Sequence, residues 1–287
     1  MNMNQTEESG NKTELEVLAA QAAEGEKEAV EKILLRIQDM VFNLSLRMLG
    51  TVVDAEDASQ EILIKVMTHL GDFRRESAFT TWVFSIATNH LLNYRKHMFA
   101  NAPLSFEYYG EDIVNGRTED LPDRTGGVDR GLLEEELKMS CTNVMLQCLD
   151  GESRCIYILG TMFKADSRVA GEILGITPEA YRQRLSRVRK KVGDFLKEYC
   201  GLSGGRCSCK RRVDYAIATH RVNPQKLDYL ELPKAGADVH EYIEAMEKAD
   251  DCSQVFSGLP MYGATKRTKE FLTGFLNSDV CNYIKNA

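Results

Sequence analysis

Apolar residues recur every three or four positions along most of this chain, which is the spacing of amphipathic helices. The clearest case runs from Asp54 to His97, where two apolar stripes follow each other and a break at Gly71 and Asp72 separates them. The first stripe is formed by Ala58, Ile62, Val66 and Leu70, and the second by Trp82, Val83, Ile86, Ala87 and Leu91. The pattern therefore predicts two consecutive helices, the second beginning near Thr80.

Two more helices are predicted between Glu14 and Leu49, with a break at Gly25. Packed against the first pair, they would form a compact helical domain over residues 14–97. Residues 1–13 are polar, lack the apolar core of a signal peptide and are expected to be a disordered tail. The chain contains no apolar run near the length of about 18 residues that a membrane span requires, so none is predicted.

A second helical unit is predicted over residues 128–199, and it ends in a helix-turn-helix pattern. Asp166 and Ser167 can cap a short helix, and Gly175 supplies a left-handed turn. Thr177 is a good N-cap for the next helix, with Pro178 in its first position. That next helix carries its apolar positions on one side, at Tyr181, Leu185, Val188, Val192 and Phe195. Its other side is basic, as expected of a helix that enters a major groove, although a solvated surface helix has the same pattern.

Charge is distributed unevenly along the chain. The formal net charge of −7 argues against general affinity for nucleic acid. Acidic residues outnumber basic ones in residues 98–127, a segment with Pro103, Pro122 and several glycines that is predicted to be a solvated, flexible linker. Basic residues predominate from Pro178 to Tyr199. A basic patch inside an acidic protein is typical of a DNA reader that does not bind DNA indiscriminately.

The segment Phe73–Phe79 mixes aromatic and basic residues between the first two helices. Rings that stack on bases, beside cations that follow the phosphates, suit single-stranded nucleic acid. The alternative is a two-helix core fragment in which Trp82 is simply buried.

The order of these residues resembles region 2 of bacterial RNA polymerase sigma factors of the extracytoplasmic-function group. The resemblance is carried by Asp54-Ala55-Glu56-Asp57, Gln60-Glu61, Phe73-Arg74, Glu76-Ser77-Ala78-Phe79, Thr81-Trp82, Ile86-Ala87 and Asn89. The helix-turn-helix segment resembles region 4 of the same family through Glu172-Ile173-Leu174-Gly175-Ile176, Arg182, Arg184-Leu185, Arg187 and Arg189-Lys190. It departs from the family at Val169 and Ala170, where a Glu-Ile pair is usual. The resemblance ends near Tyr199.

This resemblance implies an all-α fold of two helical domains joined by the acidic linker, and three binding surfaces. Core polymerase would dock on Asp54, Asp57, Gln60 and Glu61. The minus-ten element would be captured by Arg75, Ser77, Ala78, Phe79, Trp82 and Asn89. The minus-thirty-five element would be read by Thr177, Arg182, Gln183, Arg184, Ser186, Arg187 and Lys190. The linker would thread the polymerase near its RNA exit path.

Residues 200–287 form a C-terminal extension beyond the resemblance. Cys200, Cys207 and Cys209 lie in a Gly-rich loop and can converge on one soft metal ion, with His220, Cys252 or Cys281 as the fourth ligand. The alternative is a linker with incidental thiols. Some sigma factors carry a cysteine-containing extension that senses metal, and this tail resembles that arrangement. Cys141, Cys148 and Cys155 recur every seven residues and are predicted to act as buried apolar residues.

The sequence thus predicts a cytoplasmic sigma factor that directs promoter recognition and transcription initiation and has no catalytic group of its own. Its expected partners are core RNA polymerase and promoter DNA, with an anti-sigma factor or its own C-terminal extension as regulator and no membrane. Two alternatives remain open. A stand-alone helix-turn-helix regulator would not need the docking surface between Asp54 and Glu61, and a protein that sequesters a partner would not need the basic helix.

Overall fold

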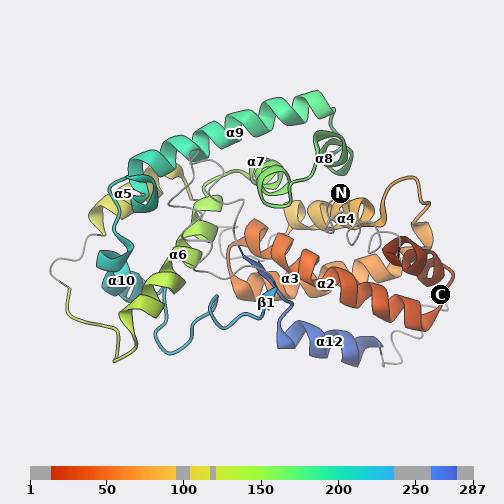
Figure 1. The fold of residues 1–287 in the computed structure, drawn as a ribbon, viewed down its shortest axis with the longest axis horizontal. Helices are drawn as coiled ribbons and strands as arrows, with labels where there is room; N and C mark the ends of the chain where they lie inside the picture. The colour runs from red at the N-terminus through yellow and green to blue at the C-terminus, as the bar shows by residue number, and fades with distance from the viewer. Residues whose placement is uncertain (1–13, 95–103, 117–120, 236–259, 277–287) are drawn as a thin grey trace, which may run out of the picture.

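The computed structural model describes residues 14–94, 104–116, 121–235 and 260–276. Within these ranges the chain is mostly helical, and a single short antiparallel sheet pairs β1 (Lys234–Ala235) with β2 (Met261–Tyr262). The expected all-α fold is therefore confirmed (Figure 1). None of the described helices is long and apolar enough to cross a membrane.

The first helical unit contains a helix over residues 14–23, then α2 (Lys27–Leu49), α3 (Val52–Thr68), the short 3-10 helix η1 (Leu70–Asp72) and α4 (Phe79–Asn93). The break at residues 71–72 and the start of the following helix lie where the sequence predicts them. Gly50 ends α2 with φ 87°, a left-handed conformation that an L side chain rarely adopts. The tight turn that follows lets α3 fold back along α2 and bury its stripe at Ile62, Leu63 and Val66.

The linker contains a helix that the sequence analysis did not predict. Helix α5 (Phe106–Asn115) begins at Ser105, whose hydroxyl accepts a hydrogen bond from the backbone N–H of Tyr108 at 3.1 Å. Phe106, Tyr109 and Ile113 are buried, and the helix packs against α9. The expectation of a solvated spacer is therefore wrong for residues 104–116, because apolar side chains at helical spacing bury one face of α5. The linker residues 98–103 and 117–120 lie outside the described ranges.

The second helical unit contains α6 (Arg130–Leu146), α7 (Gly151–Tyr157), a π-helical segment (Ile158–Met162), α8 (Ser167–Leu174) and α9 (Pro178–Tyr199). The predicted caps are confirmed. Asp166 accepts hydrogen bonds from the backbone N–H groups of Arg168 and Val169 in α8, Gly175 is left-handed at φ 65°, and the Thr177 hydroxyl caps α9. The two units share one core cluster, in which α8 and the π-helical segment pack near α4 and the rings of Phe84 and Phe163 lie 5.1 Å apart.

The described part of the C-terminal extension contains η3 (Gly201–Ser203), α10 (Cys209–Ala218), both strands and α12 (Lys266–Leu276). Helix α10 packs on α6, β2 packs on α2, and α12 packs on α3. The extension therefore contacts both helical units (Figure 1).

Candidate docking face and nucleic-acid interfaces

The polar side of α3 is the candidate docking face, defined here as Asp54, Asp57, Gln60 and Glu61. Thr51 caps the helix by accepting a hydrogen bond from the backbone N–H of Asp54 at 3.2 Å, and its hydroxyl donates to the Asp54 carboxylate at 2.6 Å. Acidic groups in the first turn also interact favourably with the positive end of the helix. All four side chains of the docking face are partly exposed, opposite a buried apolar stripe.

One end of the docking face is already in contact with the C-terminal extension. Arg267 of α12 forms ion pairs with Glu56 at 3.1 Å and with Asp57 at 2.8 Å. These hydrogen bonds and charges raise the pKa of Arg267 above its usual value. The sequence alone does not indicate this contact, because Arg267 lies about two hundred residues from its partners and no local motif marks the pairing.

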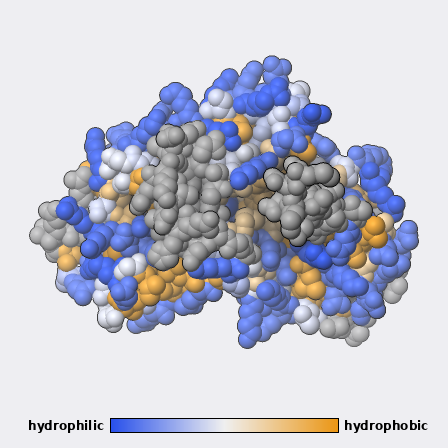
Figure 2. Space-filling model, viewed as in Figure 1, coloured by the Kyte–Doolittle hydropathy of each residue, from blue (hydrophilic) through white to orange (hydrophobic). Residues whose placement is uncertain are grey.

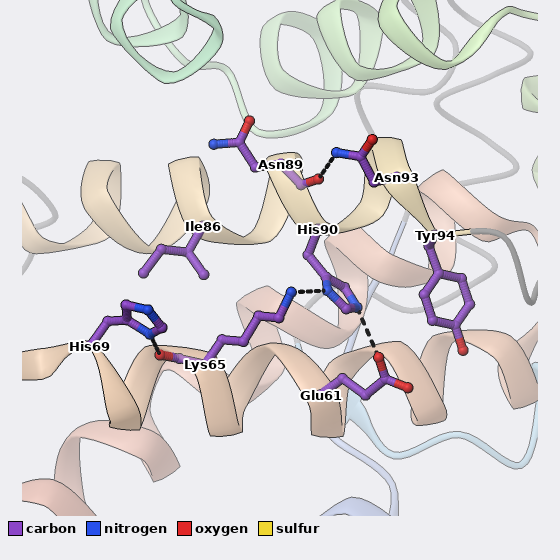
Figure 3. Close-up of a pocket in the computed structure, with 8 residues that line it drawn as sticks. All are labelled: Glu61, Lys65, His69, Ile86, Asn89, His90, Asn93 and Tyr94. Atoms are coloured by element: carbon purple, nitrogen blue, oxygen red, sulfur yellow. Dashed lines mark hydrogen bonds and ion pairs between the residues drawn. The ribbon is translucent and has the colours of Figure 1, made fainter. Parts of the chain in front are cut away.

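An open pocket of about 650 Å³ lies between α3 and α4 (Figure 3). The Lys65 ammonium lies 2.8 Å from His90 Nδ1, and His90 Nε2 lies 3.4 Å from the Glu61 carboxylate. A lysine ammonium can only donate, so Nδ1 accepts, and a neutral His90 carries its proton on Nε2, facing Glu61. Burial and the carboxylates of Glu61, Asp57 and Asp54 raise the pKa of Tyr94 at the end of the pocket. The pocket therefore connects the docking face to the helix that carries Asn89.

The aromatic residues beside α4 form a packed cluster. The Phe73, Phe79 and Trp82 rings lie 5.2 to 5.6 Å apart, and Phe79 is fully buried. In this arrangement Phe79 supports the loop and its ring is not available to a base, whereas Trp82 is partly exposed. Arg75 is exposed in a left-handed conformation at φ 59°, and Asn89 is also exposed. Ser77 and Ala78 are half-buried between them. The alternative predicted a buried Trp82, whereas Trp82 is partly exposed and the buried rings are those of Phe73 and Phe79.

The basic helix α9 separates its two faces as the sequence predicts. Tyr181, Val188, Val192 and Phe195 are buried, with Leu185 half-buried among them. Every residue of the candidate minus-thirty-five reader is exposed: Thr177, Arg182, Gln183, Arg184, Ser186, Arg187 and Lys190. Arg189 differs, because its guanidinium is bound to Thr161 and to the Gly160 carbonyl at 3.2 and 3.1 Å. Hydrophilic side chains dominate the upper edge of the molecule, along which α9 runs (Figures 1 and 2).

Cys200, Cys207 and Cys209 line one small cavity together with Cys141 of α6. The cavity has a volume of about 40 Å³, and the Tyr109 hydroxyl of α5 lies 2.9 Å from the Cys141 sulfur. A hydrogen bond from the Cys209 thiol and the nearby Arg212 lower the pKa of Cys207, while burial raises that of Cys200 to about 12.

The seven-residue spacing of Cys141, Cys148 and Cys155 predicts three core residues and does not reveal that Cys141 lies beside the other three thiols. The prediction of burial is confirmed for Cys148 and Cys155, whereas Cys141 is only half-buried. His220 is exposed at the far end of α10, while Cys252 and Cys281 fall outside the described residues. Within the described ranges, no group of three or more His, Cys, Asp or Glu side chains is arranged to hold a metal ion. Metal binding by these thiols stays a prediction.

Comparison with known proteins places this geometry in context. The family model for sigma-70 region 2 matches residues 33–97. The RNA polymerase sigma-H factor of Pseudomonas aeruginosa is 35% identical over 182 residues, covering 63% of this chain and 92% of that protein. The ECF RNA polymerase sigma factor SigW of Bacillus subtilis is 28% identical over 183 residues, covering 62% of this chain and 94% of that protein. The solved structure of CnrH in complex with the cytosolic domain of CnrY matches with a TM-score of 0.46 and 22% identity, over 63% of this chain and 96% of that one.

Proposed function

The chain belongs to the RNA polymerase sigma factors of the extracytoplasmic-function group. We propose that three of its described surfaces bind core polymerase, the minus-ten element and the minus-thirty-five element. Such a factor binds core RNA polymerase and promoter DNA and directs transcription initiation. In this proposal the polymerase supplies all catalytic groups, and the protein acts in the cytoplasm, where polymerase and DNA are found.

The docking face on α3 binds core polymerase. Its three carboxylates and one amide lie on the polar side of a helix whose opposite side is anchored in the core, so the face is held rigidly. Rigid presentation reduces the entropy lost on binding. A partner surface with cations and amide donors complements this face, because the charges attract and the amide can both donate and accept.

The loop before α4 and the exposed end of that helix bind the minus-ten element as a single strand. Arg75 presents a cation to the phosphates, and Asn89 presents an amide that can donate and accept hydrogen bonds at a base edge. Ser77, Ala78 and Trp82 are partly exposed and lie between Arg75 and Asn89 in the sequence, and the buried Phe79 supports the loop. Extrusion of a base costs a few kcal/mol, which contacts of this kind must offset.

Helix α9 reads the minus-thirty-five element in the major groove. The single observation that supports this most strongly is that all seven candidate reading residues, six on α9 and Thr177 at its N-cap, are exposed while the opposite side of the helix is buried. The arginines among them can bind guanine through two hydrogen bonds or bind phosphate.

In vitro transcription tests the proposal, with core polymerase and this protein as the only specificity factor. The template is a library of fragments with randomised minus-thirty-five and minus-ten positions, and core polymerase alone is the control. We expect transcripts that start at a fixed distance from two enriched sequence elements. If the protein binds DNA but produces no such transcripts, it is a stand-alone regulator. If it binds neither polymerase nor DNA, the proposal is wrong in full.

We also propose that Cys200, Cys207 and Cys209, with Cys141 as a fourth thiol, form a regulatory site that binds a soft metal ion or changes redox state. The four sulfurs line one cavity, and a thiolate at Cys207 is both a metal ligand and a nucleophile. With a peroxide as oxidant, Cys207 and Cys209 would lose two protons and two electrons to form a disulfide, and the peroxide would be reduced to water or an alcohol and water. The Tyr109 contact would transmit either event to α5.

A variant with Cys200→Ser, Cys207→Ser and Cys209→Ser tests this site, with Cys148→Ala as a buried-thiol control. Metal content after purification without chelator, and transcription under added zinc, copper or peroxide, are the measurements. We expect bound metal or a changed transcription yield in the wild type and the control only. If the wild type carries no metal and responds like the triple variant to every addition, the site has no regulatory role.

A further inference from the structure

Helix α12 holds a cation between two carboxylates of α3. The two terminal nitrogens of Arg267 reach Glu56 at 3.1 Å and Asp57 at 2.8 Å, so one guanidinium neutralises part of the acidic surface. The Glu56 side chain is only 14% exposed, whereas those of Asp57 and Arg267 are 45% and 54% exposed. The contact therefore lies at the solvent boundary, where an exposed ion pair is weak and can be exchanged.

The remainder of α12 is held against the first helical unit by apolar side chains. Thr268, Leu272 and Leu276 are buried at a spacing of four residues, which places them on one side of the helix. Leu272 and Leu276 belong to the core cluster to which α3 contributes Ile62 and Val66. In Figure 1 α12 lies along the lower edge of the molecule, and it packs against α3. A partner that takes the place of α12 must offer apolar side chains as well as a cation.

The segment just before α12 is anchored by buried hydrogen bonds, in contrast to the exposed ion pair of Arg267. The buried Asn43 side chain accepts from the Tyr262 backbone N–H at 2.9 Å and donates to the Tyr262 carbonyl at 2.6 Å. The buried Arg47 guanidinium donates to the Pro260 carbonyl at 2.8 Å. Asp39 accepts from the backbone N–H of Ala264 at 2.7 Å. This anchor on α2 keeps α12 close to α3 even when the exposed ion pair opens, so the local concentration of α12 stays high.

From this contrast we infer that α3 around Glu56 and Asp57 is one docking surface with two alternative occupants, α12 and core polymerase. The inference rests on the proposed docking function. Asp57 is a member of the docking face and is bound by Arg267, so Arg267 of α12 must release it before a polymerase cation can take the same place. The C-terminal extension is therefore an internal competitor for this surface, and anything that displaces α12 increases polymerase binding.

Two charge reversals on α12 test the competition. Arg267→Glu replaces the attraction to Glu56 and Asp57 by repulsion, and Lys269→Glu is the matched control, since Lys269 is exposed on the same helix and forms no described ion pair with α3. The measurement is the Kd of the full chain for core polymerase. We expect Arg267→Glu to bind about three- to tenfold more tightly than wild type, because the competent state is more populated. Lys269→Glu and the conservative Arg267→Lys should stay near wild type.

The competition is contradicted if wild type and Arg267→Glu bind core polymerase with equal affinity, or if Lys269→Glu gains as much affinity as Arg267→Glu. Either result leaves the docking function in place. If none of the variants binds core polymerase, both the docking function and the competition are wrong.

Hydrogen exchange on the wild-type chain is a second test, which needs no substitution. When core polymerase is added to the wild-type chain, amides of α12 should exchange faster while those of α3 become protected. Protection of α3 without faster exchange in α12 contradicts the inference.

Discussion

Helices α9 and α3 both present a charged face for a macromolecular partner. The face on α9 is open to solvent, whereas part of the face on α3 is in contact with α12. The reading residues of α9 are all exposed, and their few side-chain contacts are made within the same helical unit. On α3, a helix from the far end of the chain binds Glu56 and Asp57. The two faces have the same amphipathic pattern, so amphipathic pattern alone does not reveal whether a surface is accessible.

The largest expected effect comes from removing the anchor that keeps the C-terminal extension near α3. Arg47→Met deletes hydrogen bonds from a buried guanidinium to Asn143 and to the Pro260 carbonyl, and both acceptors are left without that donor. We expect the free energy of unfolding to fall by about 3–5 kcal/mol. Urea denaturation measures it, with the exposed Arg36→Met as control. A loss below about 1 kcal/mol would mean that the anchor does not stabilise the fold.

The next largest expected effect is a change of stability with pH, which arises where α6 contacts the chain between α10 and β1. Glu136 of α6 accepts hydrogen bonds from the backbone N–H groups of Tyr229 and Leu230 at 3.0 Å, and burial raises its pKa to about 7. A carboxyl with a raised folded-state pKa contributes stability below its unfolded pKa, and that contribution is lost as pH rises through the folded pKa. Between about pH 4.5 and pH 7 wild type should therefore lose about 3 kcal/mol relative to Glu136→Gln. Parallel stability curves for the two proteins would contradict this assignment.

The docking face itself is tested by Gln60→Ala with Glu61→Ala. We expect core-polymerase affinity to fall about tenfold, because an amide and a carboxylate are removed from the face. Helicity should remain normal, since both side chains lie outside the buried stripe of α3. A pull-down with core polymerase and circular dichroism are the measurements. Unchanged affinity in a normally folded variant would remove α3 from the docking role.

On the open face, Arg182→Ala should reduce transcription from promoters that depend on the minus-thirty-five element. A lost contact to a base edge should cost about 1–3 kcal/mol and relax specificity at one position. The matched control is Lys197→Ala, an exposed cation on α9 outside the reading residues. Transcription equal to wild type on such promoters would show that α9 is wrongly assigned.

The smallest effect is expected at Lys190, which forms an exposed ion pair with Asp194 at 2.9 Å. Lys190→Ala should change stability by less than about 0.5 kcal/mol, because exposed pairs contribute little. If Lys190 binds phosphate, the variant should bind all DNA sequences slightly less well and the salt slope should fall by about 1. Affinity titrations at several salt concentrations measure this, and a loss confined to one sequence would instead indicate a base contact.

The sequence by itself determined the parts of this protein that rest on interactions between near neighbours. The caps at Asp166 and Thr177 and the left-handed Gly175 are bonds and conformations within a few residues, so residue types alone predict them. The separation of basic and apolar sides on α9 follows from helical periodicity in the same way. Helix α5 was missed although its apolar spacing is local, because prolines, glycines and acidic residues around it are typical of a linker.

Only the tertiary structure decided which surfaces are open and which distant residues meet. The pairing of Arg267 with Asp57, the arrival of Cys141 beside Cys200, Cys207 and Cys209, and the burial of Phe79 each depend on the path of the whole chain. The gain from such a contact is available only after a long loop has closed, and that cost depends on everything else that packs. For this reason the sequence predicted the docking face on α3, and the fold alone revealed that α12 already binds it.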